Sequence, residues 1–427
     1  MPDRPRPDRA REGLAGPGGP VRLDWRCKGL PSRAEGLTGE EIGRLGLRIA
    51  DMMMPVAVLR ESALAHNIAA MQDFADRIGA RLCPHGKTSM SPELFARQMA
   101  AGAWGLTAAT AHHVRIYRRL GIDRVFLANQ LVAGPDIDWI LDELARDPGF
   151  DFYCLADSVD AVDRLAARAA QAVRPVQLLV ETGRTAGRAG ARSLDDALAV
   201  ARRIAASPHL RLRGVETFEG VRPSAAGARR DGAGTIAFAV AAAEAIVADG
   251  LAADGPFLLS AGGSAFLDLC AAGLPDSIGP RPVVKVIRPG CYVTHDHGLY
   301  EELVRPGGAA GVPELKPALE VWSCVLSLPE PGLAIVGLGK RDLSHDAGLP
   351  RPIAATRGGK GAIPVAKMRT LDLWDQHAAI ACPDGSLRVG DLVGFGISHP
   401  CATFDRWRAL FVADDSNRVA GAIATIF

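Results

Sequence analysis

The feature that most constrains the fold is a repeated alternation of short apolar runs and amphipathic segments between residues 55 and 290. Parallel strands joined by helices produce this rhythm. The stretch 62–78 shows the helical half, because its apolar residues recur every three or four positions and Gly79 can end the helix. Eight such units predict a closed (β/α)8 barrel, although an open doubly wound sheet has the same local pattern. The predicted strands are 81–84, 104–108, 125–128, 152–155, 176–180, 210–215, 257–260 and 283–287.

The pattern changes after residue 291. The stretches "ALEVWSCVLSLPE", "GLAIVGLGK", "SLRVGDLVGFG" and "RWRALFVADDSNRVAGAIATIF" are short or alternating apolar runs broken by Pro, Gly, Asp and Asn, which predicts a mainly antiparallel β domain. We therefore expect a barrel over 51–290 and a β domain over 291–427, with 21–50 as a segment that can join the β domain. Residues 1–20, rich in Pro, Gly, Arg and Asp and without the apolar region of a secretory signal, are predicted to be a disordered lead-in.

The bulk composition excludes several classes of partner. The formal net charge of +1 gives no electrostatic reason to expect nucleic acid or an anionic membrane. An uninterrupted apolar run of about 18 residues, which a membrane span needs, is not found. The eight cysteines are scattered without a CxxC motif, which favours a reducing cytoplasm over a disulfide framework.

A single lysine stands at the end of the first predicted strand, in "RLCPHGKTSM". Most lysines extend to the rim of an element and do no chemistry, but catalytic groups of (β/α)8 barrels lie at the carboxyl ends of strands, where Lys87 is expected. The seventh strand is followed by "SAGGSAF", and Gly262, Gly263 and Ser264 fit a phosphate site, although such a turn is also a common tight connection. A reactive lysine together with a phosphate site indicates pyridoxal phosphate.

A second candidate site lies in "GISHPCATFDRW". His399 and Cys401 are two residues apart, so on an extended strand both side chains point to the same face and form half of a zinc site. A structural histidine beside an inert cysteine is the alternative. A zinc ion next to pyridoxal phosphate would act as a Lewis acid on a β-hydroxyl, which indicates β-hydroxy amino acids as substrates. Other histidines that can complete the site, with nothing to select among them, are His85, His295, His297, His345 and His377.

The motifs "PHGKTSMSPEL", "GKRDLSHDAGLP" and "GISHPCATFDRW" resemble those of the bacterial D-serine dehydratase-like amino acid deaminases. These are relatives of the D-threonine aldolases within the alanine racemase fold type of pyridoxal phosphate enzymes. The resemblance runs from about residue 50 to the end of the chain. It implies an alanine racemase-type barrel plus a β domain, a homodimer, Lys87 as the lysine that binds pyridoxal phosphate covalently, and a divalent metal, zinc by preference, on His399 and Cys401.

The same resemblance assigns two further residues. Arg188, in "GRTAGRAG", matches the family arginine that contacts the phenolic oxygen of the cofactor, and Tyr292, after "RPG", matches a tyrosine near the cofactor phosphate. Otherwise they are a surface arginine and an ordinary aromatic. The chain departs from many relatives in "VETFEG", where they carry a tyrosine. Glu219 of this stretch either protonates the pyridine nitrogen or binds solvent.

The expected reaction is elimination from a D-3-hydroxy amino acid such as D-serine. A partly desolvated Lys87 removes the α-proton, the metal assists loss of the β-hydroxyl, and the products are a keto acid and ammonia. Retro-aldol cleavage of D-threonine to glycine and acetaldehyde is the close alternative. We lean to elimination because, within the resemblance, a cysteine as the second ligand is more like the dehydratases. An amino acid racemase and a non-catalytic pyridoxal phosphate-binding protein are the remaining alternatives.

Overall fold

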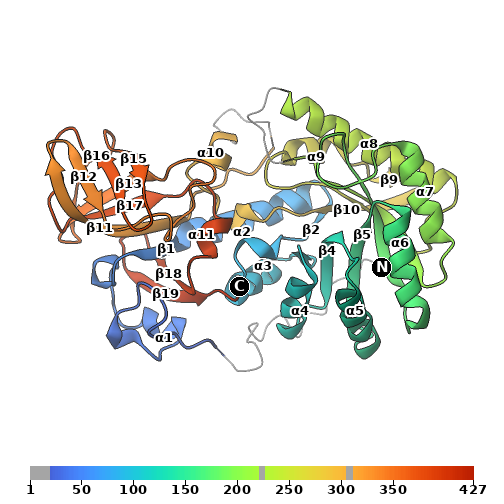
Figure 1. The fold of residues 1–427 in the computed structure, drawn as a ribbon, viewed down its shortest axis with the longest axis horizontal. Coiled ribbons are helices and arrows are strands. Elements are labelled where there is room, and N and C mark those ends of the chain that lie inside the picture. The colour runs from blue at the N-terminus through green and yellow to red at the C-terminus, as the bar shows by residue number, and fades with distance from the viewer. Residues whose placement is uncertain (1–19, 221–226, 304–310) are drawn as a thin grey trace.

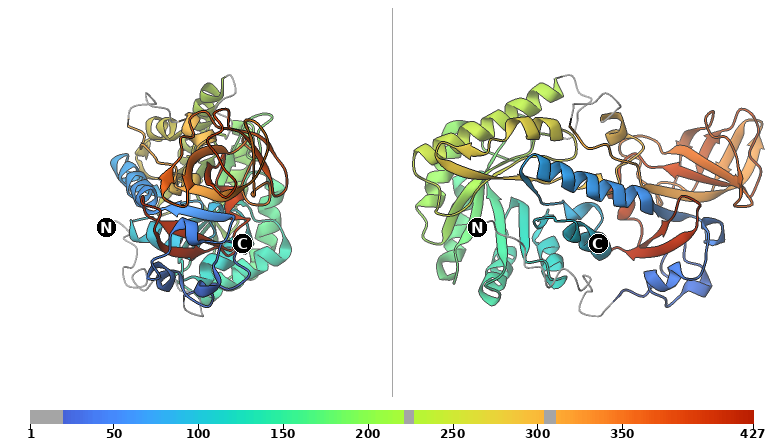
Figure 2. Two further views of the ribbon diagram at one scale, coloured as in Figure 1. Left: turned by 90° about the vertical axis from the view of Figure 1, so that its left-hand side faces the viewer. Right: turned by 180° about the vertical axis from the view of Figure 1, so that it is seen from behind.

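The computed structural model describes residues 20–220, 227–303 and 311–427, which form two β-sheet units side by side (Figure 1). The predicted disordered lead-in therefore lies outside the described residues. One unit is a parallel barrel wrapped by helices, and the other is built on a mainly antiparallel sheet. Helix α2 (Glu61–Arg77) runs lengthwise between them, as the right-hand view of Figure 2 shows.

The barrel has eight parallel strands in the order β2-β10-β8-β7-β6-β5-β4-β3, with the short β9 (Ser277–Ile278) beside β10. It closes between β2 and β3, where Trp104 N donates to Leu82 O at 2.7 Å and Thr107 N donates to Pro84 O at 2.8 Å. The predicted closed barrel is thus confirmed, with a strand at each of the eight predicted places. The strands are β2 (Ala80–Leu82), β3 (Leu106–Ala108), β4 (Arg124–Gln130), β5 (Asp151–Ala156), β6 (Val176–Thr182), β7 (Leu210–Thr217), β8 (Phe257–Ser260) and β10 (Arg281–Ile287).

Helices cover the outside of the barrel because each strand sends alternate side chains inward and outward. The inner set includes Trp104, Phe126 and Tyr153. The outer set packs against the helices in the largest core cluster. Gly79 takes a φ of +65° directly after α2, as the sequence predicts for its end. The other barrel helices are α3 (Pro92–Ala100), α4 (Ala111–Arg119), α5 (Gly134–Arg146), α6 (Val159–Arg168), α7 (Leu194–Ala205), α8 (Ala228–Ala248) and α9 (Leu267–Gly273), with the short helix η4 (Ala169–Gln171) after α6.

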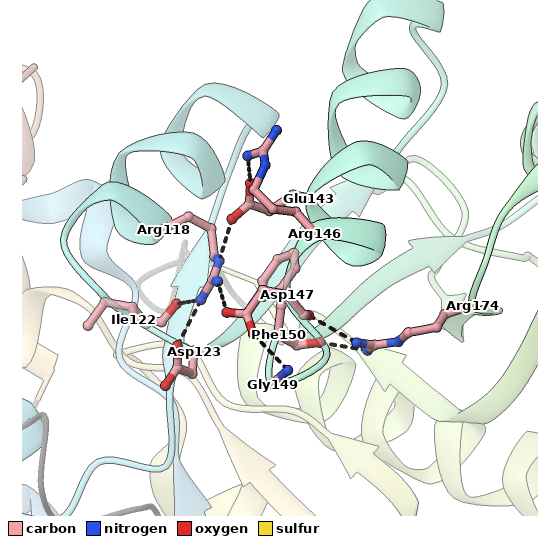
Figure 3. A network of polar contacts seen from close by, with 9 residues as sticks. All are labelled: Arg118, Ile122, Asp123, Glu143, Arg146, Asp147, Gly149, Phe150 and Arg174. Atoms are coloured by element: carbon pink, nitrogen blue, oxygen red, sulfur yellow. Dashed lines mark hydrogen bonds and ion pairs between the residues drawn. The ribbon is translucent and has the colours of Figure 1, made fainter.

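Polar contacts fix neighbouring helices of this outer layer. The guanidinium of Arg118 on α4 contacts Asp123, Glu143 of α5 and Asp147 just beyond α5 (Figure 3). By length and apolar composition alone, α8 is a described helix that could cross a membrane. In this fold it packs against α7, α9 and β7 on the outside of the barrel.

The second unit is a ten-stranded sheet with the main order β14-β13-β17-β11-β1-β18-β19, while β12, β16 and β15 extend from β11. Its strands are β1 (Val56–Arg60), β11 (Leu319–Glu330), β12 (Leu333–Val336), β13 (Arg351–Arg357), β14 (Gly361–Ala362), β15 (Arg369–Leu373), β16 (Ala378–Ala381), β17 (Leu392–Gly396), β18 (Ala409–Ala413) and β19 (Val419–Ala424). Five of these strands, β11, β12, β17, β18 and β19, correspond to the four predicted apolar stretches.

The N-terminal part of the chain also belongs to this sheet unit. Strand β1 pairs with β11 and β18, although the sequence division assigned residues 51–290 to the barrel. The barrel proper therefore starts after β1, because both edges of that strand pair with strands of the sheet unit. The segment before β1, which packs on β18 and β19, holds η1 (Ser32–Ala34), α1 (Gly39–Gly43) and η2 (Ile49–Asp51).

Candidate active site

Lys87 lies in the short helix η3 (Gly86–Thr88), directly beyond the carboxyl end of the first barrel strand. Gly86 approaches its neighbours so closely that a Cβ there would lie 2.3 Å from the Tyr117 hydroxyl. The backbone next to the lysine therefore requires glycine. The Lys87 side chain is exposed, which differs from the partly desolvated lysine expected from sequence.

Positive charge converges on His85, two residues before Lys87. Burial, followed by the charges of Lys87 and Arg288, holds the pKa of His85 well below its ordinary value. The imidazole is therefore neutral at physiological pH. Its Nδ1 atom is buried and has no partner among the described residues. A polar atom in this position at the mouth of a barrel indicates that a ligand or water binds beside it.

A buried ion pair spans the inside of the barrel mouth. Arg288, directly after β10, contacts the Glu216 carboxylate on β7, and burial raises the pKa of Glu216 to about 8 although the Arg288 charge opposes it. Nε and Nη1 of Arg288 and Oε2 of Glu216 are buried without a partner among the described residues. These atoms and His85 Nδ1 offer hydrogen bonds to a polar ligand, so the mouth fits a cofactor that carries ring nitrogen, hydroxyl and phosphate groups.

Arg188 lies in the loop between β6 and α7 and lines a cleft at the barrel mouth with Glu181, Phe218, Glu219 and Phe266. Its guanidinium lies 4.4 Å from the centre of the Phe218 ring, a cation–π contact. The side chain is exposed toward this cleft, where the sequence places it. Its contact with the phenolic oxygen of the cofactor stays a prediction.

The glycine turn after β8 has an unexpected partner. The amides of Gly262 and Gly263 donate to the two carboxylate oxygens of the buried Glu219, at 3.1 and 2.6 Å. In the structure these two N–H groups are therefore bound by the protein itself rather than open to a phosphate. Glu219 thus stabilises the turn, and its role toward the pyridine nitrogen stays a prediction. Ser264, half-buried in the same turn, is still predicted to contact phosphate.

Tyr292 belongs to the short helix η5 (Cys291–Val293) that follows β10. Its ring is buried in the barrel core, and its hydroxyl accepts a hydrogen bond from Gln98 of α3 at 2.9 Å. The tyrosine thus fixes the end of β10 to α3. Its predicted contact with the cofactor phosphate is not tested by these contacts and stays a prediction.

His399 and Cys401 do come together, but not on a strand. Strand β17 ends at Gly396, and Pro400 takes helical angles and precedes the helix α11 (Cys401–Phe404). The expectation of an extended strand is therefore wrong, because proline fixes φ and starts helices readily. The turn directs both side chains to one point, where the imidazole and the thiol meet the thiol of Cys291. The ligand atoms of the three residues lie within 4.8 Å of one another.

Each side of this cluster is held by further contacts. Nδ1 of His399 lies 2.9 Å from Asp346 Oδ2, which leaves Nε2 for a metal. Burial would lower the pKa of His399, but bonds to Cys401 and Asp346 outweigh it and raise the pKa to about 9. The contacts with Cys291 and then with His399 hold the pKa of the Cys401 thiol well below its ordinary value. A thiolate and an imidazole are the ligands that zinc prefers.

The cluster lies against the lysine loop. Cys401 Sγ is 3.4 Å from the hydroxyl oxygen of Thr88, the residue that follows Lys87. The segment before Cys291 also touches this loop, since His85 N donates to Pro289 O at 3.1 Å. The two sites that the sequence predicts separately, about 310 residues apart, are thus one site at the junction of the barrel and the sheet unit.

The comparisons agree with this arrangement. The alanine racemase N-terminal domain matches residues 59–297 and the putative serine dehydratase domain matches 318–413. D-threo-3-hydroxyaspartate dehydratase of Delftia sp. is 31% identical over 308 residues, 70% of this chain and 74% of that protein. 3-Hydroxy-D-aspartate aldolase of Paracoccus denitrificans is 26% identical over 354 residues, 81% of this chain and 84% of that protein. The chain belongs to the D-serine dehydratase and D-threonine aldolase family.

Solved structures of this family share the fold. D-threonine aldolase from Filomicrobium marinum superposes with a TM-score of 0.75 at 22% identity, covering 90% of this chain and 97% of the other. A mutant of D-threo-3-hydroxyaspartate dehydratase in its metal-free form gives 0.71 at 25% identity, covering 89% and 99%. Family membership and the thiol–imidazole cluster confirm the predicted cofactors, pyridoxal phosphate and a divalent metal.

Sequence reasoning missed three residues in or around this cluster. Cys291 stands in "RPGCY" after the last barrel strand, but the sequence analysis assigned a role only to its neighbour Tyr292. Asp346 and Thr88 stand inside the recognised motifs and give no separate signal. In the part of the chain that the structure describes, the five histidines proposed to complete the site supply none of the three clustered ligand atoms: His85, His295, His297, His345 and His377.

Proposed function

We propose that the chain is a pyridoxal phosphate- and metal-dependent lyase that acts on D-3-hydroxy amino acids, and within that class a D-serine-type dehydratase. The observation that carries the proposal is the 3.4 Å contact between Cys401 and Thr88. This contact supports the proposal, because it joins Cys401, which we propose as a metal ligand, to the loop that holds Lys87. One substrate can therefore reach the lysine with its Cα and the metal with its β-oxygen.

Bound pyridoxal phosphate supplies an electron sink for negative charge at Cα, and a bound metal supplies a Lewis acid for the β-hydroxyl. The chain's own residues do the rest. The Lys87 amine takes the α-proton, since it stands at the mouth of the barrel on a loop that Gly86 fixes. His85, two residues before it, is neutral and so adds no further positive charge beside the Lys87 amine. His399, oriented by Asp346 through Nδ1, would hold the metal through Nε2.

Dehydration is favoured over aldol cleavage by two observations. The second ligand is a cysteine, and the identity to a named dehydratase, 31%, exceeds the 26% to a named aldolase. Cleavage of the Cα–Cβ bond is the second candidate, supported by the aldolases among the relatives. The metal-binding cluster speaks against a racemase and against a non-catalytic carrier, since neither needs it. The eight free cysteines support the cytoplasm as the compartment. The homodimer is likewise a proposal, to be checked by sizing the protein in solution.

The test measures products and the absorbance of the bound cofactor. Purified protein incubated with D-serine, D-threonine and D-3-hydroxyaspartate is expected to release ammonia and the corresponding keto acid, and no acetaldehyde or glycine. K87A should lose the visible absorbance of lysine-bound cofactor and all turnover, whereas K360A, which changes an exposed lysine in the β13–β14 turn, should retain both. Glycine as the main product would establish the aldolase, and an unaltered spectrum in K87A would refute the assignment of Lys87.

A second test removes the metal with a chelator. Removal of the metal should abolish product formation from D-serine while the cofactor stays bound, because the ligands of the two groups are different residues. Full activity in a strong chelator would contradict the role of the metal and favour the racemase.

A further inference from the structure

Cys291 is a buried thiol that the proposed function does not use. It is 6% exposed and begins η5, immediately after the last strand of the barrel. Its Sγ lies 3.5 Å from Cys401 Sγ, and the ligand atoms of Cys291, Cys401 and His399 converge within 4.8 Å. Thiol groups are weak hydrogen-bond donors and acceptors, so a contact between two of them has little value for folding. Their convergence on an imidazole requires another explanation.

We infer that Cys291 is a third protein ligand of the metal, so that the site is Cys2His with one position open for the β-oxygen of the substrate. This inference rests on the proposed function only for the identity of the molecule in the open position. Two thiolates at ~2.3 Å from a tetrahedral zinc ion are roughly 3.8 Å apart. The observed 3.5 Å between the two sulfurs is close to this value and far beyond the ~2.05 Å of a disulfide.

Each of the three ligands also has its own outer partner. Tyr300 lies beside the Cys291 thiol, Thr88 contacts Cys401, and Asp346 contacts His399. Metal ligands in proteins are typically oriented by such second contacts. A merely structural cysteine in a core has no need of a buried phenol as a partner. The surroundings of Cys291 are therefore like those of the other two ligands.

Two consequences follow from a third ligand. A donor set of two thiolates and one imidazole favours zinc over magnesium, calcium or manganese, which prefer oxygen ligands. With three protein ligands, a tetrahedral ion keeps one exchangeable position, as catalytic zinc sites do. The metal also joins the two units of the fold, because Cys291 follows the barrel strand β10 while His399 and Cys401 follow β17 of the sheet. Metal binding should therefore stabilise the junction of the two units.

The experiment uses C291S and C291A with bound pyridoxal phosphate, and C324S as the matched control, since Cys324 is a half-buried thiol of β11 outside the cluster. Replacement of the native ion by cobalt(II) reports thiolate ligands through a sulfur-to-cobalt absorption. That absorption per bound ion is expected to fall by about half in both Cys291 variants, and zinc affinity by at least about tenfold. The rise in melting temperature on zinc addition should shrink in both. C324S should match the wild type in all three.

Wild-type absorption and zinc affinity in C291S and C291A would overturn the inference. Should both variants fail to fold, alkylation of the wild-type protein by iodoacetamide gives the test. Zinc is expected to protect Cys291 and Cys401 from alkylation, while Cys324 reacts equally with and without zinc. Alkylation of Cys291 at the same rate in both conditions would overturn it. A wild type that shows two thiolates on cobalt but forms no product from any D-3-hydroxy amino acid would refute the proposed function and leave the ligand assignment intact.

Discussion

The contact between Asp346 and His399 gives a sharp test of how the metal site is held. The carboxylate lies 2.9 Å from Nδ1 of the imidazole, so it fixes the ring and leaves Nε2 toward the metal. D346N keeps the size of the side chain and one oxygen that can accept the N–H, and removes only the negative charge. Loss of such an outer partner weakens metal binding by roughly 10- to 100-fold.

The exposure of the pair determines where in this range D346N should fall. The Asp346 side chain is 53% exposed and that of His399 is 24% exposed, so water and salt screen much of the attraction. We expect about a tenfold loss of zinc affinity, ~1.4 kcal/mol, in D346N, and a larger loss in D346A, where the ring is also free to turn.

The assay is competition for zinc with a chromophoric chelator at fixed pH, at low and at high salt. The difference between wild type and D346N should shrink at high salt, because the lost interaction is electrostatic. D375N is the control, since Asp375 is 73% exposed and is not one of the three clustered residues. Equal affinity of D346N and wild type at low salt would refute the reasoning.

Two further predictions concern the lysine loop and acid stability. G86A should lower the fraction of chains that hold pyridoxal phosphate, because the new Cβ would lie 2.3 Å from the Tyr117 hydroxyl. G86A/Y117F should recover part of that loss. G234A, at a glycine with open space around it, should leave the fraction unchanged. Burial lowers the pKa of His295 to about 4. Because the unfolded chain binds a proton there that the folded chain does not, unfolding free energy should fall by roughly 2 kcal/mol between pH 6.5 and 5, measured by urea unfolding in chelator. H295N should remove this part of the pH dependence of the unfolding free energy, since asparagine tolerates the φ of +49° and can accept from Asp296 N. An unchanged pH dependence in H295N would contradict the argument about His295. Unchanged cofactor content in G86A would contradict the argument about the lysine loop.

The sequence predicted the barrel well because parallel strands leave a strong local signal. Each barrel strand is a short apolar run and each helix has a 3.6-residue period, so α2 and the closing Gly79 were found almost to the residue. The strands of the sheet unit were harder to predict from the sequence. Strands β13 and β15 carry polar residues on exposed faces and gave little pattern, and β1 was assigned to the wrong unit because its partners lie far away in the chain.

The site was predicted in its chemistry but not in its geometry. Motifs identify Lys87, His399 and Cys401 because their neighbours are distinctive, whereas the partners of Glu219 and the third thiol of the cluster depend on loops from different strands. Those contacts are set by the closure of the barrel and the docking of the sheet unit. Neither leaves a trace in the spacing of residues along the chain.

The pairing of β1 also constrains the order in which the chain can be assembled during synthesis. Val56 lies opposite Trp322, and Val58 lies opposite Phe411, so the whole barrel is an excursion between two strands of one sheet. On a ribosome, the barrel is complete while both edges of β1 still lack neighbours, and an uncovered strand edge is a template for wrong association. A nascent chain halted before residue 319 would therefore carry a finished barrel together with β1, whose two edges would both be unpaired and able to associate with other strands.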